Sequence, residues 1–323
     1  MATLLWLQGG ACSGNTMSFL NAEEPSACDL VTDFGIEILW HPSLGMELGE
    51  NAKRIFYDCA SGARPLDIFV FEGTVIQAPN GTGRYNMFAD RPMQEWVREL
   101  AAQAGIVVAI GDCACWGGIP AMAPNPSQST GLQFHKRELG GFLGPNWRSK
   151  AGLPVINIPG CPAHPDWVTQ ILVAVASGRA ADIALDELQR PQTFFTSFTQ
   201  TGCTRVQFFE YKQSTLEFGQ GTRTGCLFYE FGCRGPMTRS PCNRILWNRQ
   251  SSKTRAGMPC TGCTEPEFPF FDLAPGTVFK TQKISGAIPK EVPTGTDPIS
   301  YMALAAAARV AAPKWAKEDM FVV

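Results

Sequence analysis

Residues 106–118 read IVVAIGDCACWGG. The first five residues are all apolar, which predicts a short strand buried on both faces, as in a parallel sheet. Glycine and cysteine follow this strand directly, so a tight turn and a candidate ligand stand at its carboxyl end. Four further apolar runs have the same character and are predicted strands: residues 3–8, 36–41, 66–72 and 154–158.

Helical patterns alternate with these apolar runs. Residues 92–104 and 165–177 each begin with proline, which is favoured in the first turn of a helix, and repeat apolar residues at helical spacing. Strands and helices that alternate with short connections predict a doubly wound α/β domain, to which we assign residues 1–190. Residues 124–142 are expected to form an excursion from this domain.

Strand signals fade after residue 190, and residues 191–323 are assigned to a second domain. Cysteine, glycine and proline dominate residues 200–269, a composition that would hold together poorly through apolar burial alone. Bound metal clusters would therefore supply part of the folding free energy of a loop-rich domain. An Ala-rich helix is expected at residues 299–315, ended or kinked by Pro313.

The composition argues against several classes of protein. Charged residues make up 17% of the 323-residue chain, below the roughly 25% of typical globular proteins, which is compatible with a large buried interface. The net charge is -2 and no basic stripe occurs, which argues against nucleic-acid binding. No apolar run reaches the ~18–20 residues that a membrane span requires.

The chain contains twelve cysteines, and its start, MATLLWLQGGACSGN, has no basic n-region, twin arginine or small-residue cleavage site. A cytoplasmic location is therefore expected, with peripheral attachment to the inner face of the membrane as the alternative. Disulfides are rare in that reducing compartment. Metal coordination is thus the favoured role of most of these thiols.

Three cysteines follow separate predicted strands at their carboxyl ends: Cys12, Cys113 and Cys161. Glu72 ends another of these strands. Open α/β sheets bind ligands at this edge, and the neighbouring glycines allow the backbone to approach a bulky ligand. The pattern predicts one metal site built from three strands, and the alternative is three cysteines buried there independently.

Two further sets of three cysteines lie in the second domain. One set is Cys203, Cys226 and Cys233, and the other is Cys242, Cys260 and Cys263, which closes with a C-x-x-C. Zinc is the alternative occupant, but it would prefer a fourth thiolate or a histidine, and none of the three histidines falls in this region. Iron–sulfur clusters are therefore favoured over zinc.

Taken in order, the motifs WLQGGACSGN, GDCACWGGIP, PGCPAHP, GCRGP and GMPCTGCTEPEF give the chain a resemblance to the small subunit of NiFe hydrogenases over nearly its whole length. The resemblance implies a flavodoxin-like first domain and a cluster-binding C-terminal domain. It also implies three iron–sulfur clusters in a line and a large subunit that holds the nickel–iron centre.

The resemblance assigns the cysteines to the clusters by matching position. The proximal cluster would be bound by Cys12, Cys113 and Cys161. The distal cluster would be bound by Cys203, Cys226 and Cys233. The medial cluster, commonly [3Fe-4S] in the family, would be bound by Cys242, Cys260 and Cys263.

The chain departs from the family pattern at two ligand positions. Asn15 stands where the family has the second cysteine of a C-x-x-C, and Gln200 stands where it has a histidine. The gap between Cys226 and Cys233 is also one residue longer than expected. An amide binds iron far more weakly than thiolate or imidazole, so each site keeps three strong ligands. We expect all three clusters to be [3Fe-4S], with [4Fe-4S] at the proximal and distal sites as the alternative.

Cys115 and Glu72 also lie near these motifs, and two alternative roles are open for each of them. Cys115 lies two residues after Cys113 and is either a fourth thiolate or, as favoured here, a buried thiol. Glu72 matches a Glu-Gly of the family and is either a proton relay or a capping carboxylate. Cys28 and Cys59 match no ligand position, and both are predicted in the core.

The resemblance therefore implies the electron-transfer subunit of a cytoplasmic uptake hydrogenase, group 2-like, of the cyanobacterial or actinobacterial type. The partner would oxidise hydrogen, while this chain would pass electrons to a quinone or a redox protein. A potential raised by three-iron clusters would favour hydrogen uptake. Heterodimers are expected to assemble further. The alternatives are a hydrogen-sensing subunit that signals to a kinase, a complex I-like subunit and a zinc-stabilised interaction protein.

Overall fold

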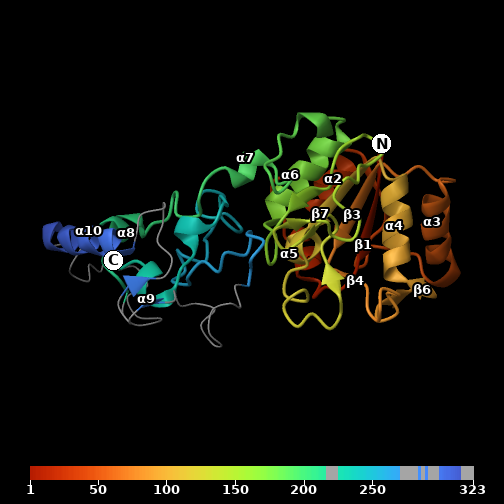
Figure 1. The fold of residues 1–323 in the computed structure, drawn as a ribbon. Helices are drawn as coiled ribbons and strands as arrows, with labels where there is room; N and C mark the ends of the chain where they lie inside the picture. Colours follow the sequence, from red (N-terminus) through yellow and green to blue (C-terminus); the bar gives the residue numbers. More distant parts are fainter. Residues whose placement is uncertain (216–224, 270–282, 285–287, 290–297, 314–323) are drawn as a thin grey trace. The chain divides into compact units, whose positions relative to one another are not determined.

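The computed structural model describes residues 1–215, 225–269, 283–284, 288–289 and 298–313 (Figure 1). The chain divides into two compact units. The first comprises Met1–Phe194 together with Cys263–Glu267, and the second comprises Phe195–Gly262 and the described residues from Phe268 onward. The boundary predicted from sequence lies after residue 190, and that prediction assigned Cys263–Glu267 to the C-terminal domain.

A five-stranded parallel sheet forms the centre of the first unit. Its order is β11-β7-β3-β1-β2, which is the flavodoxin order 2-1-3-4-5. The doubly wound α/β class is confirmed, and every predicted strand is present with bounds within two residues of those expected. The strands are β1 (Ala2–Gln8), β2 (Ile36–Trp40), β3 (Ile68–Glu72), β7 (Ile106–Ile110) and β11 (Ile156–Ile158).

The register of the sheet brings four strand ends to the same level. Glu72 pairs with Gln8 on one side and with Ile110 on the other, and Ile110 pairs with Ile158. Because all of these pairings are parallel, the segments that leave β1, β3, β7 and β11 start side by side. This edge of the sheet is where the first set of cysteines was predicted to meet.

Helices cover both faces of the sheet. The predicted helices at 92–104 and 165–177 are confirmed as α4 (Met93–Gln103) and α6 (Pro165–Ala176). Helix α4 packs against α3 (Gly49–Ser61) on one face, while α1 (Gly14–Phe19) and α2 (Ala27–Thr32) pack against α6 on the other (Figure 1). The short α5 (Gly111–Trp116) follows β7 directly. A one-turn η1 (Ala180–Asp182) lies beyond α6.

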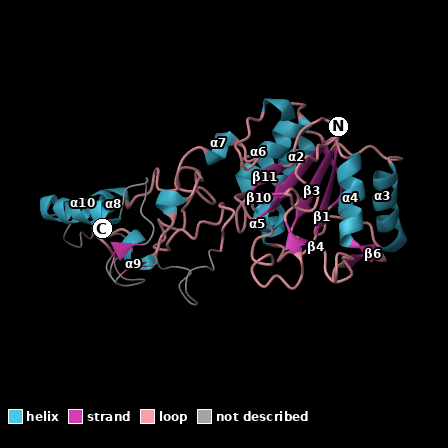
Figure 2. Ribbon diagram, viewed as in Figure 1, coloured by secondary structure: helices cyan, strands magenta, loops and turns pink. Residues whose placement is uncertain are grey.

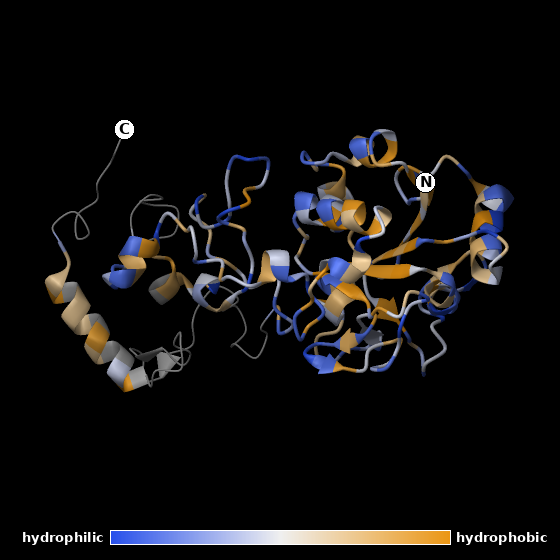
Figure 3. Cartoon of the chain, turned by 90° about the horizontal axis from the view of Figure 1, so that it is seen from above, coloured by the Kyte–Doolittle hydropathy of each residue, from blue (hydrophilic) through white to orange (hydrophobic). Residues whose placement is uncertain are grey.

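The core of the first unit lies between the sheet and the helices. Figure 3 shows the strands coloured as hydrophobic, in line with the fully buried side chains of Leu5, Phe69 and Phe71. Trp96 and Leu100 of α4 pack into the same cluster. Burial of each such side chain contributes roughly 1.5–3 kcal/mol, so this domain does not depend on a metal for its core.

The predicted excursion at 124–142 is fastened to the first unit by small strands. β8 (Ser129–Thr130) pairs with β4 (Val75–Ile76), and β9 (Phe134–His135) forms a hairpin with β10 (Glu138–Leu139). A separate pair joins β5 (Met87–Phe88) to β6 (Arg91–Pro92). These pairings close loops over the sheet edge without extending the sheet itself.

The second unit consists mainly of loops (Figure 2). Its small apolar cluster combines Phe209, Leu227 and Phe228 with the thiols of Cys226, Cys233 and Cys260. The predicted helix at 299–315 is present as α10, which ends at Ala311; residues 314–315 lie outside the described residues. The other elements from residue 192 onward are α7 (Gln192–Phe195), α8 (Val206–Glu210), α9 (Phe228–Phe231), η2 (Gly235–Met237), β12 (Lys283–Ile284), β13 (Ile288–Pro289) and α10 (Pro298–Ala311).

No helix in the described part of the chain is both long enough and apolar enough to cross a membrane.

Candidate metal centres

Cys12, Cys113 and Cys161 lie shortly after β1, β7 and β11, whose ends the parallel register brings to one level at the carboxyl edge of the sheet. Burial, together with the nearby Asp112, Cys161 and Cys12, raises the pKa of Cys113 to about 12. Cys113 therefore lies within electrostatic range of both Cys161 and Cys12. A bound metal would reverse this effect, since coordination deprotonates a thiol.

Glycines leave room beside the thiols of this set. A Cβ atom at Gly14 would lie 3.2 Å from Cys12 Sγ, and one at Gly118 would lie 2.8 Å from Cys113 Sγ. Gly118 also has a φ of +53°, which favours glycine. The backbone therefore approaches both thiols as closely as only glycine permits, and this geometry fits a bulky group bound to sulfur.

Asn15 lies among the segments that carry these thiols. It is buried, and its Oδ1 accepts a hydrogen bond from the backbone N–H of Ala163 at 2.8 Å. A Cβ atom at Gly111 would lie 2.1 Å from Asn15 Nδ2, so the amide packs directly on the start of α5. The side chain at the fourth-ligand position thus connects the loops that follow β1, β7 and β11.

Glu72 is completely buried behind the loop that carries Cys12. Its Oε1 accepts hydrogen bonds from the backbone N–H groups of Asn15 (3.0 Å) and Thr16 (3.2 Å), at the start of α1. Its Oε2 accepts from the Thr16 hydroxyl at 2.5 Å and from Trp6 Nε1 at 3.1 Å. These contacts are those of a capping carboxylate, because all four donors stabilise a negative charge at a helix N-terminus.

Cys115 points into the core of the first unit. Its side chain is fully buried, and its thiol donates to the Ala109 carbonyl oxygen over 3.5 Å. It belongs to the same apolar cluster as Trp116 and Phe134, and burial raises its pKa well above the usual range. Residues two apart on a helix point in different directions, so Cys113 and Cys115 face different surroundings.

Cys59 and Cys28, which match no ligand position, differ in exposure. Cys59 is fully buried on α3, as predicted, and burial raises its pKa to about 11. The prediction that Cys28 lies in the core was wrong, since Cys28 is exposed on α2. The buried residue of α2 is Leu30, and Cys28, two positions earlier, faces solvent.

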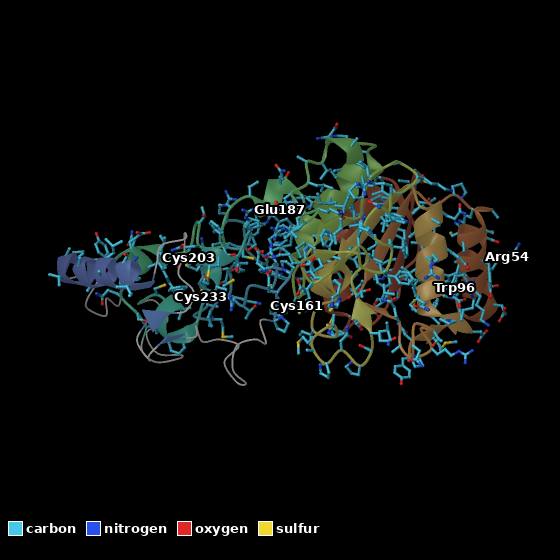
Figure 4. The ribbon with its side chains drawn as sticks, viewed as in Figure 1. Arg54, Trp96, Cys161, Glu187, Cys203 and Cys233 are labelled. Atoms are coloured by element: carbon cyan, nitrogen blue, oxygen red, sulfur yellow. The ribbon has the colours of Figure 1, made fainter. Side chains whose placement is uncertain are left out.

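Cys203, Cys226 and Cys233 line one pocket in the second unit. Figure 4 labels Cys203 and Cys233 among the sulfur atoms of this unit. Gln200 lines the same pocket, so the residue at the expected histidine position does reach the site. A Cβ atom at Gly235 would lie 3.4 Å from Cys233 Sγ, so glycine again borders a thiol.

Backbone N–H groups point at the sulfur atoms of this pocket. Cys203 Sγ accepts from the N–H of Arg205 at 3.4 Å, and Cys226 Sγ accepts from the N–H of Phe228 at 3.4 Å. Cys233 Sγ accepts from the N–H of Cys260 at 3.2 Å. Hydrogen bonds to sulfur are among the factors that set the potential of an iron–sulfur cluster, so the donors suit an anionic sulfur group.

Burial dominates the protonation of Cys226 and Cys233 in the protein chain alone. It raises the pKa of Cys226 to about 12, against the lowering effect of the Phe228 N–H. It raises the pKa of Cys233 well above the usual range. Such thiols would remain protonated at neutral pH without a cation, so a metal that replaces their protons fits the donor set.

The third predicted set is divided between the two units. Cys242 and Cys260 belong to the second unit, where Cys242 Sγ accepts from Ser240 Oγ at 3.1 Å and Cys260 Sγ accepts from the Gly262 N–H at 3.4 Å. Cys263 belongs to the first unit. The grouping of these three cysteines around a medial cluster stays a prediction.

Several buried charged residues near the cysteines were not predicted, among them Arg190, Asp112 and Arg205. Arg190 pairs with Asp186 and donates to the Thr264 carbonyl at 3.0 Å, which holds the segment that follows Cys263. Asp112 is buried directly before Cys113, and neither of its oxygens has a hydrogen-bond partner among the described residues. Arg205 borders the pocket of the second unit. Asp112 and Arg205 each stand within two positions of a candidate ligand, and this spacing in the sequence could have indicated that they lie near a site.

No three His, Cys, Asp or Glu side chains in the described ranges come close enough together to hold a single metal ion.

Two family patterns match successive parts of the chain. The family described as NADH ubiquinone oxidoreductase, 20 Kd subunit, matches residues 12–175, and the family of the C-terminal part of NiFe/NiFeSe hydrogenase small subunits matches residues 195–273. Both names denote subunits of redox enzyme complexes. The second match covers the region that the complex I-like alternative would not explain.

Two similar proteins specify the class of redox subunit more closely than the two family patterns do. The chain is 32% identical over 292 residues to the F420 non-reducing hydrogenase II small subunit of Methanosarcina mazei, covering 82% of this chain and 73% of the relative. It is 29% identical over 276 residues to the periplasmic [NiFe] hydrogenase small subunit of Solidesulfovibrio fructosivorans, covering 84% of this chain and 81% of the relative. The chain belongs to the family of NiFe hydrogenase small subunits.

A solved structure supports the same assignment. The actinobacterial-type NiFe-hydrogenase from Ralstonia eutropha H16 superimposes with a TM-score of 0.77 at 29% identity, over 99% of this chain and 94% of that one. The similarity covers both units, so the loop-rich second unit is part of the family fold as well.

Proposed function

We propose that this chain is the electron-transfer small subunit of a NiFe uptake hydrogenase and that it binds three iron–sulfur clusters. The large subunit would convert hydrogen into two protons and two electrons, and this chain would carry the electrons only. Bound clusters would each accept and release one electron at a time. The external acceptor would be a quinone or a redox protein, and heterodimers would assemble further.

The observation that carries this proposal is the pocket of the second unit, which is lined by three thiols whose sulfur atoms each accept a hydrogen bond from a backbone N–H group. The chain supplies what such a group needs: sulfur ligands, donors aimed at sulfur, and apolar side chains in the lining. Phe209 and Leu227 form part of that lining. The same logic applies to Cys12, Cys113 and Cys161 at the sheet edge.

We infer that each cluster has only three thiolate ligands and is of the [3Fe-4S] type. At the sheet edge, Asn15 uses its amide oxygen to hold Ala163, and Cys115 points into the core. In the second unit, Gln200 offers the pocket an amide where the family pattern has imidazole. High potentials would follow from this cluster type and would favour hydrogen uptake. A cytoplasmic location, or peripheral attachment to the membrane, remains part of this proposal.

An EPR-monitored redox titration of the co-purified complex tests the cluster types. We expect oxidised three-iron signals that disappear on reduction at high potential, together with an iron count that matches three three-iron clusters. Strong signals from reduced [4Fe-4S] clusters at low potential would contradict the three-thiolate proposal. A colourless complex without iron would contradict the electron-transfer function itself.

Two cysteine variants, one at a proposed ligand and one in the core, provide a matched comparison. Cys113→Ser should remove the signal of one cluster, whereas Cys115→Ser should leave the iron count unchanged, because Cys115 lies in the core. Turnover with artificial electron acceptors separates uptake from hydrogen sensing, since a sensor would turn over slowly. Slow turnover in the fully loaded complex would favour the sensing function.

A further inference from the structure

Arg190 fastens the segment that begins with Cys263 to the rest of the first unit. Its side chain is only 1% exposed, and its Nη1 donates to the Thr264 carbonyl at 3.0 Å and to Glu265 Oε1 at 3.3 Å. On its other side, Nε donates to Asp186 Oδ2 at 2.8 Å. The planar guanidinium thus holds the two residues that directly follow a proposed ligand of the medial cluster.

A tight turn orients Arg190 towards this segment. Asp186 Oδ1 accepts hydrogen bonds from the backbone N–H groups of Leu188 and Arg190, each at 2.9 Å, and the N–H of Asp186 donates to the Arg190 carbonyl at 3.0 Å. One carboxylate therefore fixes both the backbone and the guanidinium of Arg190. Because its side chain is already ordered by Asp186, little further conformational entropy is lost when it holds the Cys263 segment.

The same turn is anchored on β11, the strand that leads to Cys161. The backbone N–H of Asn157 donates to the Gln189 carbonyl at 2.9 Å, and Asn157 Nδ2 donates to the Leu188 carbonyl at 2.9 Å. Asn157 is fully buried, so this anchor lies in the core of the first unit. A continuous set of hydrogen bonds therefore runs from the strand before Cys161 to the residues after Cys263.

The fastened segment lies close to the edge of the sheet that carries Cys113. Burial raises the pKa of Asp112, the residue before Cys113, well above its usual range, and Cys263 adds to this effect. Cys263 is therefore within electrostatic range of Asp112. The contacts of Arg190 thus hold one proposed ligand of the medial cluster near the segment that carries a proposed ligand of the proximal cluster.

We propose that Arg190 is a positioning residue of the electron relay, which holds the Cys263 thiol where the medial cluster requires it. The clamp consists of the contacts that tie Thr264 and Glu265 to the turn on β11. This inference rests on the proposed function, because it requires a cluster bound by Cys263. Residues that orient a metal ligand without touching the metal commonly change metal affinity by roughly 10–100-fold when they are replaced.

Substitutions in the complete hydrogenase complex test the clamp. Arg190→Gln removes the guanidinium that Asp186 and Glu265 share. Arg137→Gln is the matched control, because Arg137 pairs with Glu267 on the same segment, but both side chains are partly exposed and such pairs contribute little. The measurement is the rate at which each cluster loses its iron to a chelator, followed by EPR and iron analysis.

Cys263→Ser identifies the cluster to be followed. It should remove the iron and the EPR signal of one cluster and leave the other two in place. Iron content and signals that are unchanged in Cys263→Ser would contradict the proposed medial cluster and the role of Arg190 together. A cluster that depends on Cys263 but behaves normally in Arg190→Gln would overturn the role of Arg190 alone.

We expect Arg190→Gln to accelerate the loss of this one cluster by roughly 10–100-fold, while the other two clusters keep their rates. Arg137→Gln should stay close to the unsubstituted complex at all three clusters. Equal acceleration at all three clusters in Arg190→Gln would show a general loss of structure and would overturn the proposal.

Arg190→Lys decides the outcome if Arg190→Gln yields no complex. Lysine keeps the positive charge but has a single nitrogen, which cannot serve Asp186 and the Thr264 carbonyl at the same time. Selective loss of the cluster that depends on Cys263 would support the clamp in this variant as well. Rates equal to those of the unsubstituted complex would overturn it, because the charge alone would then be sufficient.

Discussion

The side chain of Asn15 holds the backbone of Ala163 through a hydrogen bond of 2.8 Å between Oδ1 and the N–H group. Asn15 follows Cys12 by three residues and Ala163 follows Cys161 by two, so the bond joins two segments that carry proposed sulfur ligands. The position of a fourth thiolate in the family pattern is thus occupied by a residue with a structural task. In the proposed proximal site, this substitution would leave three thiolates as the strong ligands.

Asn15→Cys should convert the proximal site towards four thiolates. We expect a low-potential [4Fe-4S] signal in place of one three-iron signal, because the new thiol supplies the missing ligand. The lost hydrogen bond should cost about 1 kcal/mol of stability. EPR and iron analysis of the complex measure the change. Asn15→Ala is the control: it loses the same hydrogen bond without gaining a thiol, so its cluster type should not change.

Glu72→Gln should destabilise the first unit without a specific effect on hydrogen turnover. Glutamine turns two donor hydrogens towards Trp6 and Thr16, which also donate, and removes the negative charge at the start of α1. We expect a loss of about 2–3 kcal/mol in the free energy of unfolding. Thermal unfolding of the complex should show a Tm lower by roughly 5–10 °C.

The control for Glu72→Gln is Glu95→Gln, which removes a partly exposed ion pair with Arg91. It should lower the free energy of unfolding only slightly. Turnover measured well below the unfolding temperature decides the role of Glu72. If Glu72→Gln abolished turnover while leaving the Tm unchanged, a proton relay would replace the capping role.

Gly118→Ala should weaken cluster binding at the sheet edge. The added Cβ would lie 2.8 Å from Cys113 Sγ, so the thiol must move away from its position. We expect the complex to lose the iron of one cluster. Gly81→Ala is the control, because Gly81 has a φ of +77° with nothing within 4 Å of the new atom. It should cost only the backbone strain of about 1–2 kcal/mol and retain all the iron. Equal iron contents in the two variants would show that Cys113 tolerates the contact.

His41 should make the stability of the first unit depend on pH. It packs against Trp6, with ring centroids 4.8 Å apart, and burial lowers its pKa to about 4. The unfolded chain binds this proton near pH 6.5, so the full contribution is present above that value. As the pH falls from 6.5 to 4, the unfolded state is protonated first and up to about 3 kcal/mol of stability is lost.

Thermal unfolding of the complex between pH 8 and 4 measures this dependence. His41→Gln removes the titrating group, so its Tm should decline less steeply between pH 6.5 and 4 than that of the unsubstituted complex. The same decline in both proteins would exclude His41 as the source.

Local patterns explain why the strands could be predicted closely. The apolar runs that form β1, β3 and β7 are buried on both faces, and each ends where glycine allows the chain to turn. Parallel pairing then brings Cys12, Cys113 and Cys161 to one edge. Both steps depend on residues near one another in the chain or on a general property of α/β sheets.

Long-range contacts could not be inferred in this way. The partners of Glu72 include Thr16, which is 56 residues away, and Trp6, which is 66 residues away. Cys28 was misplaced because a six-residue helix offers too short a pattern to show which side is buried. The burial of Arg205 was not predicted, because a charged residue two positions after a cysteine is expected on the surface from the sequence alone.

The sequence by itself determined the α/β class, the order of predicted elements and the family, because hydrophobic runs, turn residues and spaced cysteines are local features of the chain. Only the tertiary structure decided what Asn15, Glu72, Cys115 and Arg205 contact. Each of these side chains acquires its role from burial and from partners brought close by folding, and those depend on packing choices that no local pattern of residues specifies.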